Sequence, residues 1–215
     1  MENTLSAANG GFMQDLDDYF CKKFADFDML GPMPTYESAT VSMILKNKNR
    51  IEEGEYAANE MRKISYQPNP AKVLAEIKER YVDNTFTFSF RPAPFKQRIA
   101  ALFGGRNTSG KFIAKLIRNY GEQPEGLWEK IGLAQKDWKA VLRGFYIPEK
   151  SLIYKITLLL GLSREDNFAL MKECGCYYDF ADARDVIVRY LVDYRVYNRD
   201  MIDAAFDEYH IRRIL

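Results

Sequence analysis

The feature that most constrains this chain is the helical spacing of its apolar residues from Lys111 to the C-terminus. In one segment after another, apolar side chains recur three and four positions apart, as they do along one face of an α-helix. Glycines separate several of these segments, at Gly121, Gly132, Gly144 and Gly161. Because each apolar stripe must be buried against another element, the pattern predicts a set of short helices packed together.

Residues 111–175 divide into five expected helices. Gly132 can supply the positive φ of a sharp corner between the second helix and the third, which spans residues 135–143. Ser163 and Asp166 resemble a capping box at the start of the fifth helix, with Asp in the place of Glu. The residues that we expect to face the core are Phe112, Ile113, Leu116 and Ile117; Leu127, Trp128 and Ile131; Trp138, Val141 and Leu142; and Leu152, Ile153, Ile156, Leu159 and Leu160.

Two further helices are expected in a C-terminal extension, residues 176–215. Their apolar stripes consist of Val186, Ile187, Tyr190 and Leu191, and of Met201, Ile202, Ala205 and Phe206. From Ser163 onward the chain carries eight bases and eleven acids, so this part does not extend a basic surface. The composition suits packing within the molecule or self-association as a homodimer.

The N-terminal part of the chain is expected to be helical over most of residues 12–95. A flexible lead is expected at residues 1–11, where the sequence is small and polar, and a linker at residues 96–110. Helices are expected over residues 12–27, from Glu37 to about Ile64, and from Pro70 to Tyr81 with Asn69 as N-cap.

The segment Thr85–Phe90, "TFTFSF", changes the apolar period from 3.6 to 2. If it is extended, Phe86, Phe88 and Phe90 share one face. No other strand is expected, and one strand cannot form a sheet. The aromatic face either covers the helical domains as a clamp or serves as an edge that pairs with a strand of a partner.

Gly105, Gly110 and Lys111 have the spacing of a phosphate-binding P-loop. That motif requires Ser or Thr after the lysine, because the hydroxyl binds Mg²⁺, and Phe112 stands there instead. It also requires a parallel sheet, which the helical pattern does not provide. We therefore expect a linker here, with Thr108 or Ser109 capping the next helix, and no nucleotide hydrolysis.

Other enzyme and metal signatures are missing from the sequence. His210 is the only histidine, and the spacing of the three cysteines matches no tetrahedral metal site. The longest apolar runs are too short to span a bilayer. We expect a cytoplasmic protein that is not an enzyme, with no cofactor, no metal and no membrane partner.

The five-helix segment resembles the lambda-repressor-like (XRE-type) helix-turn-helix family over Phe112–Met171. The matching residues are L-x-x-x-I-G-L from Leu127, four residues, W-x-x-V-x-R-G from Trp138, then Pro148 and the "LLLGLS" that ends the fourth helix. The resemblance is closer still to a divergent bacterial branch in which two further helices follow the five. Three positions depart from the family: Trp128 replaces a small residue, Trp138 an Ile or Val, and Leu142 a Glu.

The resemblance implies that helix 135–143 enters the major groove of duplex DNA. The residues that the core does not need there, and that we expect to contact DNA, are Gln135, Lys136, Lys139 and Arg143. Glutamine can pair with adenine, and lysine can reach guanine or phosphate. From Arg106 to Leu162 the chain has ten bases and five acids, although Asp137 lies within the expected reading face.

The sequence thus predicts a DNA-binding transcriptional regulator. The alternative is a protein-interaction module, an adaptor or antitoxin-like partner, that has the same scaffold without binding DNA. The scaffold alone does not decide between them.

Overall fold

The protein is mostly helical, as expected. The computed structural model describes residues 2–24, 36–37, 67–68, 70–80, 90–103 and 109–215. This part of the chain contains ten α-helices, a short 3-10 helix and two small antiparallel strand pairs. Most of the helix expected from Glu37 to Ile64 lies outside the described residues, as do Phe86 and Phe88.

The first helix, α1 (Glu2–Lys23), begins earlier than the sequence pattern predicts. Residues 2–11, expected as a flexible lead, form its first turns. Leu5, Ala7 and Ala8 are strong helix formers, which favours this extension. Its apolar side chains at helical spacing, Phe12, Leu16, Phe20 and Phe24, are buried.

The helix α5 (Pro70–Arg80) lies against α1 and starts with proline at its first position, as expected. A two-residue pair, β1 (Tyr36–Glu37) with β2 (Gln67–Pro68), precedes it. Lys78 on α5 contacts Asp17 of α1 at 2.8 Å and Glu208 of α13 (Arg199–Glu208) at 2.7 Å. These ion pairs join three helices that are far apart in the sequence.

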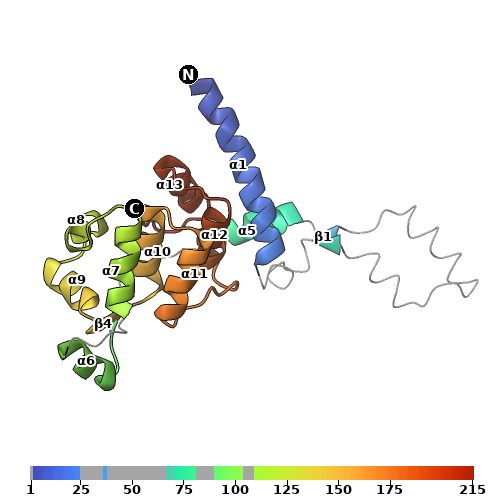
Figure 1. Ribbon diagram of the computed structural model, residues 1–215. Helices are drawn as coiled ribbons and strands as arrows, with labels where there is room; N and C mark the ends of the chain where they lie inside the picture. The colour runs from blue at the N-terminus through green and yellow to red at the C-terminus, as the bar shows by residue number, and fades with distance from the viewer. Residues whose placement is uncertain (1, 25–35, 38–66, 69, 81–89, 104–108) are drawn as a thin grey trace, which may run out of the picture.

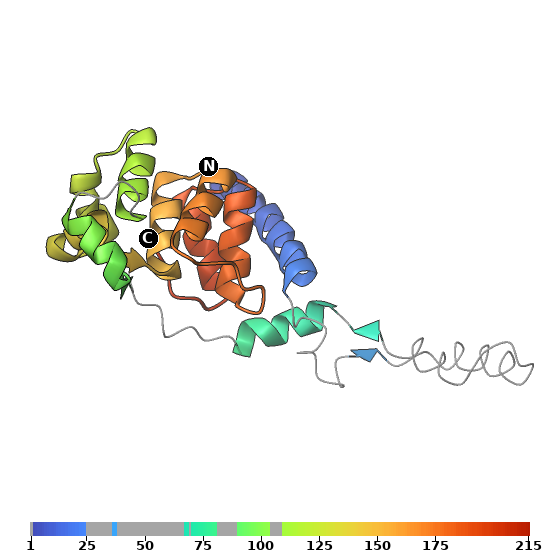
Figure 2. The ribbon, with the colours of Figure 1, turned by 60° about the horizontal axis from the view of Figure 1, so that its bottom comes forward.

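The five helices expected between residues 111 and 175 are all present. They are α7 (Ser109–Asn119), α8 (Leu127–Ile131), α9 (Gln135–Leu142), α10 (Lys150–Leu160) and α11 (Arg164–Glu173), with the 3-10 turn η2 (Pro124–Gly126) before α8. Figures 1 and 2 show α8 and α9 at the end of the molecule away from α1.

The capping box expected at the start of α11 is present in a modified form. The Ser163 hydroxyl accepts a hydrogen bond from the Asp166 N–H at 3.1 Å. The return contact passes through Tyr120, whose hydroxyl accepts from the Ser163 N–H at 2.7 Å and donates to the Asp166 carboxylate at 2.6 Å. The tyrosine thereby fastens α11 to the end of α7, which the sequence pattern did not indicate.

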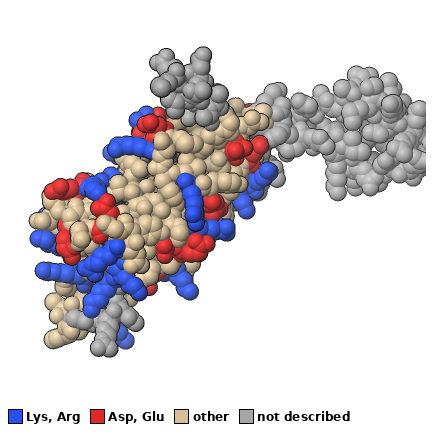
Figure 3. Space-filling view, turned by 45° about the horizontal axis from the view of Figure 1, so that its top comes forward, with Lys and Arg blue, Asp and Glu red and all other residues tan. Residues whose placement is uncertain are grey.

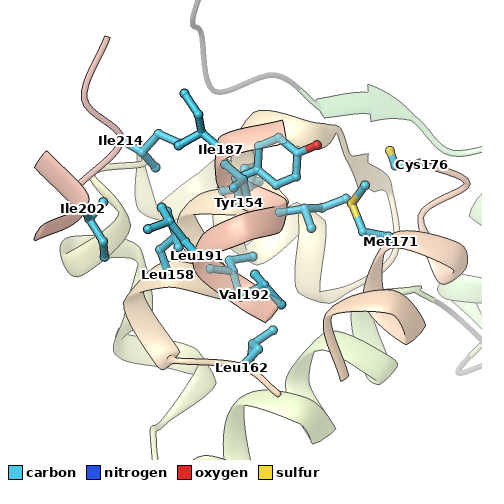
Figure 4. Packing of buried hydrophobic residues seen from close by; sticks show 14 of the residues in the cluster. Tyr154, Leu158, Leu162, Met171, Cys176, Ile187, Leu191, Val192, Ile202 and Ile214 are labelled. Carbon is cyan, nitrogen blue, oxygen red and sulfur yellow. The ribbon is translucent and has the colours of Figure 1, made fainter. Parts of the chain in front are cut away.

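The helix α12 (Ala183–Asp193) occupies the centre of the molecule. It contacts α1, α10, α11 and α13, and nine of its eleven residues are buried. Figure 4 shows Ile187 and Leu191 of α12 among side chains from α10 and α13, including Leu158 and Ile202. The expected stripes of both C-terminal helices are therefore buried within one molecule.

A short sheet joins two segments that are distant in the sequence. The strand β3 (Phe90–Pro92) pairs antiparallel with β4 (Tyr146–Pro148), and the Phe90 and Tyr146 rings lie 4.9 Å apart. The expectation that the aromatic segment finds no strand partner in the chain is wrong for Phe90. A strand of three residues is too short to show a period of 2, so the sequence pattern does not indicate β4.

Part of the expected linker 96–110 is helical. The helix α6 (Phe95–Leu102) follows β3, has no buried residue, and lies near α9 in both ribbon views (Figures 1 and 2). Ser109 and Gly110 belong to the first turn of α7 and are buried. The sequence pattern does not indicate this helix, because its apolar residues follow two prolines and have no core to face.

Candidate nucleic-acid interface

The corner between α8 and α9 has the geometry that the sequence predicts. Gly132 ends α8 with φ of 75°, in the left-handed region that glycine adopts most readily. The N–H groups of Gly132 and Leu133 both donate to the Trp128 carbonyl, at 2.9 Å and 3.0 Å. This arrangement turns the chain sharply and starts α9 three residues later.

Trp138 anchors α9 in the core. Its side chain is fully buried, and its indole N–H donates to the Pro124 carbonyl at 2.6 Å. Ile131 and Val141 are fully buried as well, whereas Trp128 is only half-buried. The expected orientation of the helix is thus confirmed, because the apolar residues of α9 turn inward.

The opposite side of α9, together with its C-cap residue Arg143, carries the four residues expected to contact DNA. Gln135, Lys136, Lys139 and Arg143 are all exposed. Lys139 follows Gln135 by four positions and Arg143 follows Lys139 by four, so the three share one helix face, with Lys136 beside it.

Charge on this face is positive. In the part of the chain that the structure describes, no ion pair engages Lys136, Lys139 or Arg143. Asp137, the one acid of α9, is half-buried beside them.

The helices next to α9 carry further bases, some of which are paired with acids. Lys115 on α7, the helix packed against α9, is exposed. Lys130 on α8 forms a short ion pair with Glu122, and Arg118 lies 3.6 Å from Glu125. Acids therefore offset Lys130 and Arg118, whereas Lys115 of α7 adds to the positive charge on α9. Figure 3 shows the densest group of Lys and Arg side chains at the end of the molecule where α6 lies.

The packing of α7 on α9 accounts for one glycine of the P-loop-like spacing, Gly110. A Cβ at Gly110 would lie 2.3 Å from the carbonyl oxygens of Val141 and Leu142. This glycine is therefore needed for a close helix crossing. The first turn of α7 faces the carboxyl end of α9, so the partial charges of the two helix ends attract. Residues 104–108 of the motif lie outside the described residues.

The described residues contain neither a cluster for a metal ion nor a helix that could cross a membrane. Among the described residues, no three His, Cys, Asp or Glu side chains lie close enough to bind a metal ion. None of the helices in that part of the chain is both long and apolar enough to cross a membrane. No family model, curated protein or solved structure matches the chain.

Proposed function

We propose that the protein binds duplex DNA through the exposed face of α9 and acts as a transcriptional regulator. The observation that carries the proposal is the row of Gln135, Lys139 and Arg143, with Lys136 beside it, on a helix whose other side is fixed by Trp138. Residues on a rigid element can be held in register with base edges. A helix is also of a width that the major groove of B-DNA, about 12 Å across, admits.

The test is binding of the whole protein to random-sequence duplex DNA at two salt concentrations. Each lysine that contacts phosphate should contribute about one unit to the slope of log affinity against log salt concentration. We expect Lys136→Ala and Lys139→Ala each to lower that slope by about one unit while the free energy of unfolding changes by less than about 0.5 kcal/mol. Lys22→Ala, an exposed lysine on α1, is the matched control and should leave the slope unchanged.

Absence of salt-sensitive binding by the wild-type protein at low ionic strength would contradict the DNA proposal. An equal loss in the Lys22 variant would also contradict it, because the contribution of α9 would then be no different from that of any surface lysine.

A second candidate, the protein-interaction module, is favoured by one specific observation. The helix α6 leaves its apolar side chains in solvent: Phe95, Leu102 and Phe103 are 74%, 69% and 85% exposed. The helix has two bases, Lys96 and Arg98, and no acid. The positively charged α6 would attract an acidic amphipathic helix of another protein, whereas it would repel a second copy of itself.

The two candidates can be separated with one variant. Leu102→Ser should weaken binding of a designed peptide helix with leucine on one face and glutamate on the other, and should leave the affinity for DNA unchanged. A scrambled peptide of the same composition is the control. If the wild-type protein binds both peptides equally, the α6 surface does not act as a docking face.

A further inference from the structure

We propose that a pocket between α11 and α12 binds a small aromatic carboxylic acid. The pocket has a volume of about 500 Å³ and lies at the opposite end of α11 from its cap at Ser163. Its lining comes from α11, from the connection between residues 174 and 182, and from α12. The lining residues are Phe168, Met171, Lys172, Cys176, Tyr177, Tyr178, Phe180 and Arg189.

The walls of the pocket are predominantly aromatic. Phe168 and Tyr177 are 41% and 71% exposed, although each is a large apolar or amphipathic side chain with a ring available for stacking. Tyr178 and Phe180 are partly buried and pack on the core. An aromatic ligand between these rings would remove apolar surface from water that the protein alone leaves exposed.

Tyr178 is held in place before any ligand arrives. Its hydroxyl donates to the Asn167 side-chain oxygen at 2.8 Å, and Asn167 in turn donates to the Thr157 hydroxyl at 2.9 Å. Its ring stacks on Tyr154 with centroids 5.8 Å apart. A wall that is already ordered costs little further conformational entropy on binding.

The connection that supplies half of the lining is also fixed. Asp185, which is buried, accepts hydrogen bonds from the Asp179 N–H and the Tyr154 hydroxyl, both at 2.7 Å, and forms a short ion pair with Lys150. Burial raises the pKa of this carboxyl even though these donors oppose the effect. The network anchors the connection to α10 and α12, so the pocket is a built part of the fold.

The charges at the pocket select an anion. Arg189 and Lys172 line it, and no acid does. The Arg189 guanidinium lies 4.2 Å from the Phe168 ring centroid and 5.4 Å from that of Tyr178. Its Nε donates to Asp193 at 2.8 Å, and the guanidinium has further N–H donors on its two terminal nitrogens.

Asp193 does not cancel the positive charge around the pocket. The same carboxylate also contacts Arg164 at 3.4 Å, so one acid is shared by two arginines. A carboxylate on the ligand would supply the missing negative charge and could accept paired hydrogen bonds from a guanidinium. Aromatic walls, the exposed Lys172 and a guanidinium that has donors beyond its bond to Asp193 together favour an aromatic acid.

The test uses 1-naphthoate and its uncharged analogue 1-naphthamide, titrated calorimetrically into the whole protein. We expect saturable binding of 1-naphthoate with one site per chain, and binding of the amide weaker by about tenfold or more, since charge-assisted hydrogen bonds are the stronger ones. Equal affinity for the two compounds, or binding of neither, would overturn the proposal. The measurement does not depend on DNA binding.

Variants locate the site. Tyr177→Ala and Lys172→Gln change exposed side chains and should each weaken 1-naphthoate binding by about tenfold without affecting folding. Tyr194→Ala and Lys22→Gln are the matched controls, because both residues are exposed and neither lines the pocket. Arg189→Lys keeps the positive charge but removes the paired N–H donors of the guanidinium. It should therefore weaken the binding of 1-naphthoate more than the binding of 1-naphthamide. Unchanged affinity in the Tyr177 and Lys172 variants would place the ligand elsewhere and refute the assignment.

Discussion

At the scale of single residues, the two indoles at the corner have different surroundings. Trp138 is fully buried and hydrogen-bonded to the Pro124 carbonyl, whereas Trp128 is half-buried. The sequence predicted that both face the core, because each falls on an apolar stripe. The sequence could not show which indole is more deeply buried. The hydrogen bond of Trp138 depends on where the Pro124 carbonyl of η2 lies, which the local pattern does not determine.

We expect Trp138→Ala to lower the free energy of unfolding by about 3–5 kcal/mol, because it leaves a large cavity and removes the hydrogen-bond donor that contacts Pro124. Trp128→Ala removes a half-exposed side chain and should lower the free energy of unfolding by clearly less. Urea unfolding followed by circular dichroism measures both values. Equal losses for the two variants would show that the different burial of the indoles has no energetic consequence.

The cysteines make the folded protein sensitive to alkaline pH. Burial, with Asp17 and Asp18 nearby, raises the pKa of Cys21 to about 11. Burial, with Cys176 and Glu173 nearby, raises the pKa of Cys174 to about 12. An unfolded thiol has its ordinary pKa near 9, so unfolding allows ionisation that the folded state suppresses.

The sign of this linkage gives a prediction. The contribution of the two thiols to stability is fully present below pH 9 and is lost as pH rises from 9 toward about 11 and 12. The melting temperature should therefore fall over that range. A Cys21→Ala, Cys174→Ala double variant should show a shallower decline in the same buffers, and an unchanged decline would assign the effect to other groups.

At the scale of elements, the crossing of α7 over α9 depends on Gly110. Alanine is the better helix former by about 1 kcal/mol. However, its methyl group would lie 2.3 Å from two backbone carbonyl oxygens, which cannot move independently of α9. The steric cost exceeds the gain in helix propensity, so the helices must separate.

We expect Gly110→Ala to destabilise the protein by about 1–3 kcal/mol, as overpacking does. Gly11→Ala, on α1 with nothing within 4 Å of the added methyl group, should instead stabilise it by up to about 1 kcal/mol. Thermal unfolding of the two variants beside the wild type provides the comparison. Stabilisation by both changes would contradict the close crossing.

Elements with long apolar stripes were predictable, and those whose form depends on distant partners were not. The helices from α7 to α13 follow the spacing of their apolar residues, which is a local property. The strand β4 forms because β3, far earlier in the chain, supplies its partner. The exposed positions on α9 could be predicted from the helical spacing of its buried residues. The pocket could not, because its lining side chains meet only when α12 and the connection before it pack against α11.

At the scale of the whole molecule, the helices α7 to α11 and the C-terminal helices share one core. Buried residues of α7 to α11 belong to the same hydrophobic cluster as those of α12, α13 and α1. The helices on both sides of residue 175 therefore contribute buried residues to the same cluster. Loss of α12 would expose the inner faces of four helices.

We expect Leu191→Ala, in the middle of α12, to lower the free energy of unfolding by about 2–5 kcal/mol, since Leu191 is fully buried. Leu102→Ala, on the exposed helix α6, should change it by less than about 0.5 kcal/mol. A chain that lacks residues from Ala181 onward should lose its cooperative urea transition. Cooperative unfolding of that shortened chain would show that the rest of the molecule is stable without α12 and α13.

Because α1 packs on α12, α1 cannot complete its packing until a late stage of synthesis. The Tyr19 hydroxyl of α1 donates to Asp193 of α12 across 174 positions of sequence, and Tyr209 donates to Asp17 across 192. On the ribosome, the aromatic side of α1 must wait for these residues to be synthesised before it can be buried. Contacts so distant in sequence slow folding and prolong the exposure of apolar surface. Newly made chains should therefore expose the aromatic side of α1 until both α12 and Tyr209 have left the exit tunnel, whatever the finished protein binds.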